Sequence, residues 1–381
     1  MLILAALIGV ALIIVILWEG FEVIILPRRV TRRFRLSRYF FRSFWYFWRA
    51  IGNVLVPVKY QETWLSFFGP LSNLAMIGVW VSGLIIGFSL LYWSSGSPVR
   101  TTEGSAGFIT DLYLSGTTFF TLGLGDVIPR SNLARFLTVV ESGMGFGFLA
   151  LVISYLPALN QSFSRREVSN SLLDARAGSP PSAAEMLRRH ADEHGMEGLR
   201  QLLLEWERWS AEFLEGHLSY PVLAYFRSQH ENQSWLAALT AILDTCTLVM
   251  VGLEGSCKRQ AELTFAIARH AVVDLALVFR RPPQKMPRDR LPPDTLAQLR
   301  GVLTDAGLKL NKGEAADQKL AELRQMYEPY VNGLALFFHI KLPPWVIADT
   351  KMDNWQTSAW EPQGASSGKA EREGRAKREH F

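Results

Sequence analysis

The sequence predicts an all-α membrane protein with three transmembrane helices, a short re-entrant helix and a soluble α-helical C-terminal domain. Three observations support this fold class: three long apolar runs, a short and purely basic segment between the first two, and helical periodicity without strand patterns in the C-terminal half. The chain has 381 residues, of which 49% are hydrophobic and 20% charged, with a net charge of +5. This length is enough for two domains, and the composition is too mixed for one uniform class.

Residues 1–26 predict an N-terminal transmembrane helix. The run carries no charge before Glu19 and exceeds the roughly 20 residues that span a bilayer. A signal peptide is the alternative, but the run lacks a basic leading segment and a small-residue cleavage site, and its apolar core is too long. Near the end of this helix we expect Glu19 and Glu22 to pair with the arginines that follow.

Residues 27–62 form a basic segment in which nine Lys or Arg residues precede the first acid, Glu62. A short basic loop of this kind belongs on the cytoplasmic side. From Arg35 to Leu55, apolar side chains recur at helical spacing with arginines on one flank, which predicts an amphipathic helix in the inner membrane interface. A voltage-sensing helix and a fourth span through residues 39–58 are the alternatives. Anionic lipids are expected at Arg28, Arg29, Arg32 and Arg33.

Two further transmembrane helices are predicted from runs that are almost free of charged residues. Residues 70–93 carry no charge, and a helix over residues 133–157 has Glu141 as the one charge in its apolar part. With the basic segment inside, the N-terminus lies outside, the second helix runs outward and the third returns the chain to the cytoplasm. This predicts a multi-pass protein of the cell membrane with a cytoplasmic C-terminal domain.

Between these spans lie a short helix and a glycine-containing motif. Residues 108–120 predict a helix of about three turns, too short to cross a membrane and therefore re-entrant. The motif after it reads Thr-Leu-Gly-Leu-Gly-Asp over residues 121–126. Glycine at every second position permits the alternating right- and left-handed backbone that a row of carbonyls facing one way requires. A tight turn between helices is the alternative.

This motif resembles the selectivity filter of potassium channels, whose usual form is Thr-Val-Gly-Tyr-Gly-Asp. The order of spanning helix, pore helix, filter and spanning helix over residues 66–160 is also similar to the pore domain of tetrameric cation channels. The sequence departs from the usual pattern of this family at Leu124, where an aromatic residue is usual, and at Phe120. The resemblance implies that backbone carbonyls bind dehydrated K⁺, with the filter formed by Thr121, Leu122, Gly123, Leu124 and Gly125.

The resemblance also implies supporting residues and an assembly. Asp126 would tie the filter to the pore helix, with Thr117 and Tyr113 as further supports, and Thr121 to Leu124 would hold K⁺ as the permeant ion. Four copies must surround one pore and the chain supplies one motif, so a homotetramer is expected.

The inner helix carries four candidate gating residues. Gly143 and Gly147 have the spacing of a helix-packing motif or a gating hinge. Pro157 either kinks the inner mouth or ends the span. For Glu141, a pairing behind the filter and a titratable gate are the two roles considered.

The remaining chain predicts a linker over residues 161–181, a cytoplasmic helical domain over 182–342 and a disordered tail over 343–381. Ser182 is expected to cap the first helix with Glu185 as its capping-box partner. Residues 235–253 are apolar enough for a further span, but Asp244 favours a buried helix of the bundle. The expected helices cover residues 183–193, 197–216, 220–229, 234–252, 258–279, 295–306 and 315–339.

Other chemistry finds little support in the sequence. Two cysteines, Cys246 and Cys257, suggest neither a disulfide framework nor a zinc site. His190 and His194 have helical spacing for a metal, with Glu193 beside them, but no motif completes the set. No phosphate-binding loop or nucleophile elbow occurs. We therefore expect no enzymatic activity, no cofactor besides the permeant ion and no nucleic-acid partner.

The sequence as a whole predicts a tetrameric potassium-selective channel, opened by an unidentified signal through the helical domain. A weakly selective cation channel is the alternative that Leu124 and Phe120 suggest. A non-conducting, membrane-anchored sensor or scaffold is the alternative from another class.

Overall fold

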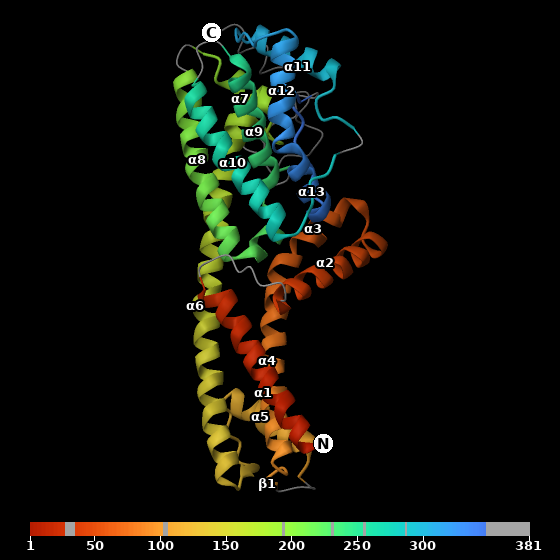
Figure 1. The fold of residues 1–381 in the computed structure, drawn as a ribbon, viewed down its shortest axis with the longest axis vertical. Coiled ribbons are helices and arrows are strands. Elements are labelled where there is room, and N and C mark those ends of the chain that lie inside the picture. Colours follow the sequence, from red (N-terminus) through yellow and green to blue (C-terminus); the bar gives the residue numbers. More distant parts are fainter. Residues whose placement is uncertain are drawn as a thin grey trace, which may run out of the picture. The chain divides into compact units, whose positions relative to one another are not determined.

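The structure is a computed structural model that describes residues 1–26, 35–101, 106–192, 195–229, 232–253, 257–285 and 288–347. It confirms the all-α fold class, because within these residues a single two-stranded antiparallel sheet accompanies the helices (Figure 1). The chain divides into two compact units. Unit 1 comprises Met1–Ser164 and Glu215–Arg227, and unit 2 comprises Arg165–Leu214 and the chain from Ser228 on.

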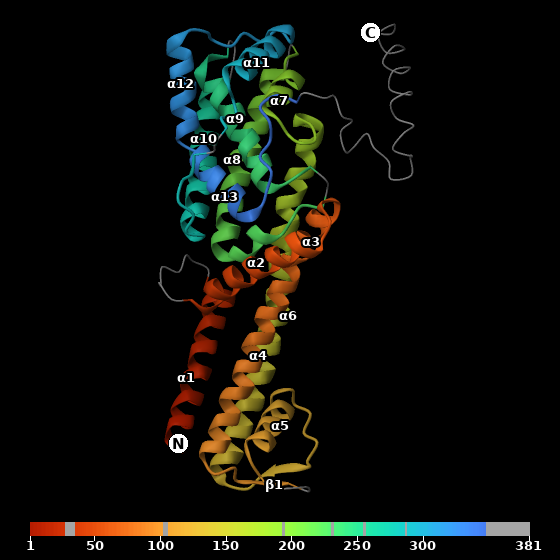
Figure 2. The ribbon, with the colours of Figure 1, turned by 90° about the vertical axis from the view of Figure 1, so that its right-hand side faces the viewer.

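In unit 1, the N-terminal helix packs along the first charge-free helix. Helix α1 (Leu2–Gly20) continues into a π-helical turn (Phe21–Ile25) and contacts α4 (Phe68–Ser94), as Figure 2 helps to follow. A Cβ atom on Gly9 would lie 2.8 Å from the carbonyl oxygen of Gly87. Small residues therefore let these two backbones approach closely, as in packed membrane helices.

The core of unit 1 joins four helices. Large side chains of α4, including the fully buried Trp80 and Tyr92, pack with Ile16 of α1, Leu114 of α5 (Phe108–Phe119) and Phe148 of α6 (Asn132–Ala177). Outside this core, α1, α4 and α6 expose many large apolar side chains. An exposed apolar surface of this extent favours a lipid or protein environment over water.

The basic segment forms a helical hairpin in which α2 (Leu36–Leu55) is followed by a short 3₁₀ turn (Val58–Tyr60) and α3 (Gln61–Ser66). The buried carboxylate of Glu19 accepts hydrogen bonds from the backbone N–H groups of Leu36 (2.8 Å) and Ser37 (3.2 Å), and so caps α2. Glu22 pairs with Arg35 at 3.8 Å, as expected from the sequence. Arg28, Arg29, Arg32 and Arg33 lie outside the described residues.

A distant segment of the chain completes unit 1. Residues 220–229 were expected to be helical, but within them only Pro221–Tyr225 form a single 3₁₀ turn. Pro221 begins this turn, and it cannot continue the preceding helix. Tyr225 is buried, and its ring centroid lies 5.5 Å from that of Trp45 and 5.1 Å from that of Phe68. The aromatic cluster holds this segment against α2 and α4.

Unit 2 is a helical bundle built around α9 (Trp235–Gly252). Among the described residues, four helices are long and apolar enough to cross a membrane, namely α1 with its π-helical turn, α4, α6 and α9. The apolar window of α9 is 89% buried inside the protein, against 17–33% for the other three. The apolarity of α9 is therefore explained by its packing against neighbouring helices: α7 (Ala183–Arg189), α10 (Lys258–Val278), α12 (Glu314–Gln325) and α13 (Glu328–Phe338).

Two sequence-based boundaries in this region were wrong. Helix α6 runs unbroken from Asn132 to Ala177 through Pro157 and through most of the expected linker, because within residues 161–181 strong helix breakers occur only from Gly178 to Pro181. The single helix expected over 315–339 is two helices, separated at Met326 and Tyr327 ahead of Pro329 in the first turn of α13.

The first residues of the predicted disordered tail are packed in the structure. Pro343 to Ile347 are part of unit 2, where Trp345 is fully buried and its carbonyl oxygen accepts a hydrogen bond from the Ala184 backbone N–H. Residues 348–381 lie outside the described residues. Ser182 caps α7 as predicted, by accepting a hydrogen bond from the Glu185 N–H at 3.2 Å. The predicted capping box is not complete, because the Ser182 N–H donates to the Ala177 carbonyl oxygen and the Glu185 carboxylate pairs with Arg188 and Arg189. Two further helices complete the unit, α8 (Gly195–Ser219) and α11 (Pro293–Asp305).

Candidate functional site

The motif over residues 121–126 has an alternating backbone. Thr121, Gly123 and Gly125 have φ angles of 56°, 59° and 79°, whereas Leu122 and Leu124 are not among the positive-φ residues of the described chain. Glycine adopts this left-handed conformation without a Cβ penalty, and Thr121 does so at a cost. Residues 121–125 are all exposed in a single chain, with Leu124 at 63%. The motif thus combines a left-handed backbone at three positions with an exposed place in a single chain.

The C-terminal end of α5 fixes where the motif begins. The Thr121 N–H donates to the Thr118 carbonyl oxygen at 2.9 Å, and the Leu122 N–H donates to the Thr117 carbonyl oxygen at 2.8 Å. The hydroxyl of Thr117 donates within its own helix, to the carbonyl oxygens of Leu114 and Tyr113. Thr117 thus contacts the motif through its backbone and not through its side chain.

The far end of the motif is tied to the same helix. The Tyr113 hydroxyl donates to Asp126 Oδ2 at 2.8 Å, and the other oxygen of Asp126 accepts from the Val127 N–H at 3.1 Å. Both ends of the motif are therefore held by α5. The structure brings Tyr113 and Asp126 together, as the resemblance implies.

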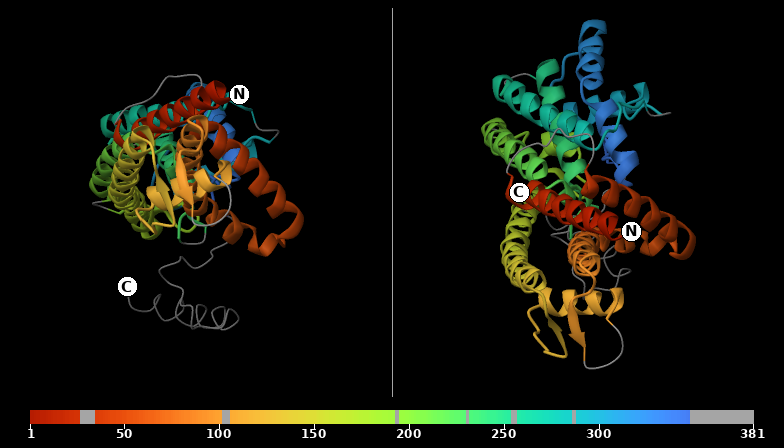
Figure 3. Two further views of the ribbon diagram at one scale, coloured as in Figure 1. Left: turned by 90° about the horizontal axis from the view of Figure 1, so that it is seen from below. Right: turned by 60° about the horizontal axis from the view of Figure 1, so that its bottom comes forward.

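Two short paired strands, which the sequence did not reveal, flank α5 and the motif along the chain. Strand β1 (Val99–Thr101) pairs antiparallel with β2 (Val127–Pro129), and Figure 3 shows it beside α5. The Ser97 hydroxyl donates to Asp111 Oδ2 at 2.5 Å and so joins the loop before β1 to α5. Three-residue strands carry too short a pattern to be recognised from the sequence.

Behind α5, the carboxylate of Glu141 is fully buried and hydrogen-bonded to two other helices. Glu141 Oε2 accepts from the Tyr92 hydroxyl of α4 at 2.9 Å, and Glu141 Oε1 accepts from the Ser115 hydroxyl of α5. Tyr92 also contacts the Thr138 hydroxyl at 3.1 Å. The sequence singled out Glu141 but missed its partners, because single tyrosine and serine residues in apolar helices carry no distinctive pattern.

The glycines of α6 differ in their surroundings. A Cβ atom on Gly145 would lie 2.1 Å from the carbonyl oxygen of Phe119, so Gly145 permits α6 to touch the end of α5. Gly143 and Gly147 would meet nothing within 4 Å in the chain. The close approach therefore depends on Gly145, which was not one of the candidate gating residues.

Other sequence-based candidates are not assembled into a site. His190 Nδ1 donates to the Met186 carbonyl oxygen at 2.8 Å, and His194 and Glu193 lie outside the described residues. Within the part of the chain that the structure describes, no group of three His, Cys, Asp or Glu residues could hold a metal ion. Cys246 is buried and Cys257 is partly exposed, and both are free thiols.

Comparisons with known proteins agree with this geometry. Residues 75–161, which contain most of α4, all of α5, the motif and the first part of α6, match the family described as "Ion channel". The fold and this match indicate an ion-channel domain in a membrane protein.

The comparisons also include one curated relative. The chain is 24% identical over 195 residues to the uncharacterized membrane protein YdjJ of Bacillus subtilis (strain 168). The alignment covers 50% of this chain and 55% of the relative, so the chain spans about half the length of the curated relative that it matches. No solved structure matches.

Proposed function

We propose that the protein is a homotetrameric, potassium-selective channel in which residues 121–125 of four chains form one filter. The observation that carries this proposal is the alternating backbone at Thr121, Gly123 and Gly125, held at both ends by α5. Such an alternation suits carbonyl oxygens that replace the hydration shell of a dehydrated cation. Thr121, Leu122, Gly123 and Leu124 would bind the K⁺ ions.

The exposure of the motif supports a tetramer. A backbone with positive φ at three positions is normally fixed by surrounding structure, yet residues 121–125 are exposed in one chain. In a ring of four chains the same residues would face each other across the pore axis. The exposed apolar side chains of α1, α4 and α6 would then face lipid or neighbouring subunits.

The orientation in the membrane follows the charge distribution. The arginines between α1 and α2 would lie at the cytoplasmic surface, with the N-terminus and the two-stranded β1–β2 sheet outside. Arg28, Arg29, Arg32 and Arg33 would attract anionic lipids there.

A route for gating through the helical domain is supported by the path of the chain. Residues 215–227 belong to unit 1, whereas the chain on either side of them belongs to unit 2. Within unit 1 this segment contacts the long α6, where the rings of Phe226 and Phe163 lie 5.6 Å apart. A change in unit 2 would therefore act on unit 1 through two covalent connections and through α6 itself, which passes from unit 1 into unit 2.

The proposal is tested by potassium flux from liposomes that contain the purified full-length protein. Gly123→Asp would place a carboxylate in the filter at a φ of 59°, and we expect it to abolish flux. Gly301→Asp is the matched control, because Gly301 lies on α11 with nothing within 4 Å and outside unit 1. Barium-sensitive K⁺ flux that survives only in the control supports the channel, and equal flux in both variants contradicts it.

Sodium flux separates the two channel candidates. Leu124 occupies the position where an aromatic residue usually packs around the filter, and its side chain is 63% exposed. This observation favours a weakly selective cation pore as the second candidate. Potassium flux well above sodium flux supports the first candidate, and equal fluxes support the second.

A further inference from the structure

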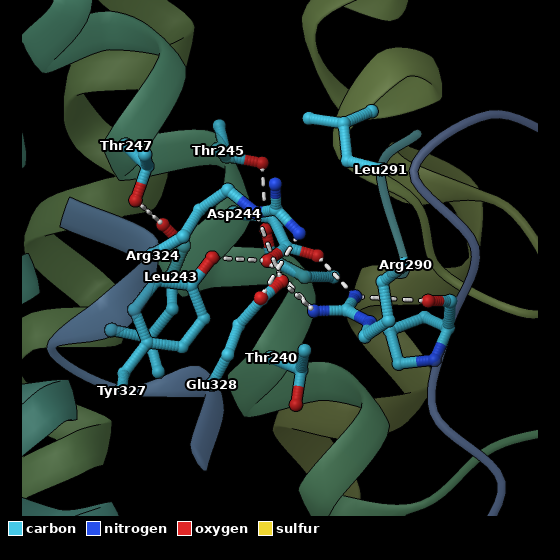
Figure 4. A network of polar contacts seen from close by, with 12 residues as sticks. Thr240, Leu243, Asp244, Thr245, Thr247, Arg290, Leu291, Arg324, Tyr327 and Glu328 are labelled. Carbon is cyan, nitrogen blue, oxygen red and sulfur yellow. Dashed lines mark hydrogen bonds and ion pairs between the residues drawn. The ribbon is translucent and has the colours of Figure 1, made fainter. Parts of the chain in front are cut away.

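Unit 2 contains a chain of charged side chains that alternate in sign. The buried Asp244 of α9 pairs with Arg290 at 2.6 Å, and Arg290 pairs with Glu328 at 3.0 Å (Figure 4). Glu328 in turn accepts from Arg324 at 3.0 Å, and Arg324 also pairs with Asp289. This network joins α9, α12 and α13 to the loop before α11, and so provides a rigid polar framework within unit 2.

Both arginines of this network stay charged despite their burial. Burial alone would lower the pKa of Arg290, but Asp244 outweighs that effect and raises the pKa. The pKa of Arg324 is raised in the same way, because Asp289 and Glu328 outweigh burial. Both guanidinium groups also lie over the ring of Trp345, at 5.7 and 5.6 Å from its centroid.

One side of the network lines a cavity of about 290 Å³. The basic side chains of Lys285, Arg288, Arg290 and Arg324 line it together with the acids Asp289 and Glu328. Because the buried Asp244 also pairs with Arg290, the group has an excess of one positive charge (four minus three). This volume is near the lower end for small-molecule sites, which hold about 300–1,000 Å³. The cavity therefore suits a small ligand with negative charge.

Several hydrogen-bond donors in this cavity are not used by the protein. Arg324 donates through Nε and Nη2, and its Nη1 makes no hydrogen bond with the described residues. Lys285 and Arg288 are exposed and have no ion pair or hydrogen bond within the described chain. Three cationic groups with free donors thus line one cavity.

An unsatisfied acceptor accompanies these donors. Asn332 also lines the cavity and is 5% exposed. Its amide nitrogen donates to the Gln284 carbonyl oxygen at 3.2 Å, which fixes the orientation of the amide, and its Oδ1 is buried without a partner. A buried polar atom without a partner is costly, and a ligand hydroxyl group would satisfy it after a small side-chain movement.

We propose that this cavity binds a small organic phosphate through Lys285, Arg288 and Arg324. A phosphate monoester carries nearly two negative charges near neutral pH and three terminal oxygens, which match three cationic donors. A hydroxyl of the ligand's organic part would donate to Asn332. The binding step is independent of conduction, whereas any effect of the ligand on the pore rests on the proposed channel function.

The test measures binding of glucose 6-phosphate to the detergent-purified full-length protein by calorimetry. Lys285→Gln with Arg288→Gln removes two positive charges that have no structural partner, and we expect at least a tenfold loss of affinity. Lys309→Gln with Lys312→Gln is the matched control, because both lysines are exposed and lie outside the cavity. Arg324→Lys keeps the charge but loses Nη1, and we expect it to weaken binding as well.

The probes also distinguish the source of the phosphate. Inorganic phosphate should compete with glucose 6-phosphate, whereas glucose should not bind. A short-chain phosphatidate that binds in place of glucose 6-phosphate, and that the Lys285/Arg288 double substitution weakens, assigns the site to a lipid headgroup. Absence of saturable binding by every phosphate probe, or equal binding by the double variant and its control, overturns the proposal. Binding without ion flux would contradict the channel and leave this site intact.

Discussion

The hydroxyl of Tyr92 donates a hydrogen bond to Glu141 Oε2 across 2.9 Å and so connects α4 to α6 behind the short helix α5. Ser115 donates to the other oxygen of the same carboxylate. Three helices of unit 1 therefore meet at one buried acid. A polar group inside an apolar environment is stable only when it is paired, so this arrangement fixes the position of α5 and of the motif that follows it.

Removing this carboxylate should destabilise unit 1. Glu141→Ala removes one acceptor from each of the hydroxyls of Tyr92 and Ser115, which keep the Thr138 hydroxyl and the Ile85 carbonyl oxygen as partners, so we expect a cost of about 1–3 kcal/mol in total. We expect a lower melting temperature for the purified protein. Glu141→Gln retains one acceptor oxygen and should have a smaller effect. An unchanged melting temperature for Glu141→Ala would show that the contact does not stabilise the unit.

Gly145 offers a steric test of how α6 packs on α5. A methyl group at this position would lie 2.1 Å from the Phe119 carbonyl oxygen, so Gly145→Ala must separate the two helices. We expect a loss of about 1–3 kcal/mol of stability, as for other overpacked sites, together with reduced flux. Gly143→Ala is the matched control, because its methyl group meets nothing within 4 Å. Alanine also has a higher helix propensity than glycine. Equal behaviour of the two variants would contradict this packing.

The local patterns were sufficient to predict the apolar helices, the short α5 and the motif over residues 121–126. Runs of apolar residues and alternating glycines are properties of consecutive residues, so the sequence displays them directly. The cap at Ser182 is equally local, since its partner Glu185 lies three residues away. These parts of the fold and of the candidate site needed no tertiary information.

The partners of Glu141 could not be predicted in the same way. Tyr92 and Ser115 are 49 and 26 residues away along the chain, and only the packing of three helices brings them together. Trp345 illustrates the same limit: the composition from residue 343 on suggested a disordered tail, but the indole is fully buried with two arginines over its ring, and the Trp345 carbonyl oxygen accepts a hydrogen bond from α7. Sequence patterns do not encode which distant surfaces meet.

Tyr225 should be needed to hold residues 215–227 in unit 1. Its buried ring contacts Phe41, Trp45 and Phe68, and Tyr225→Ala should cost about 3–5 kcal/mol, as for other large aromatic truncations. Tyr225→Phe keeps the ring and its aromatic contacts and should cost less stability than Tyr225→Ala. Thermal unfolding of both variants in detergent measures the difference. If the proposed route for gating is correct, Tyr225→Ala should also alter ion flux at temperatures where the protein is still folded.

Glu185 predicts how the stability of unit 2 depends on pH. Hydrogen bonds from Arg188, followed by those from Arg189, lower the pKa of Glu185 from 4.5 to about 2. A lowered folded-state pKa stabilises the protein above the unfolded pKa, and this contribution is lost as pH falls through the folded pKa. Because Arg188 is about half exposed, solvent screening reduces the contribution to about 1–2 kcal/mol.

Glu185→Gln should therefore be less stable than the natural protein between pH 5 and 7, and the difference should shrink as pH falls from 5 towards 2. Denaturant unfolding of both proteins at pH 7, 5, 4 and 3 measures it. Glu197→Gln is a useful comparison, because Glu197 forms the same kind of pair with Arg200 on the surface, where both side chains are about half exposed. Its effect should be smaller, since water screens that pair. A Glu185→Gln difference that stays constant over this pH range would mean that lost packing, and not lost charge, causes the destabilisation.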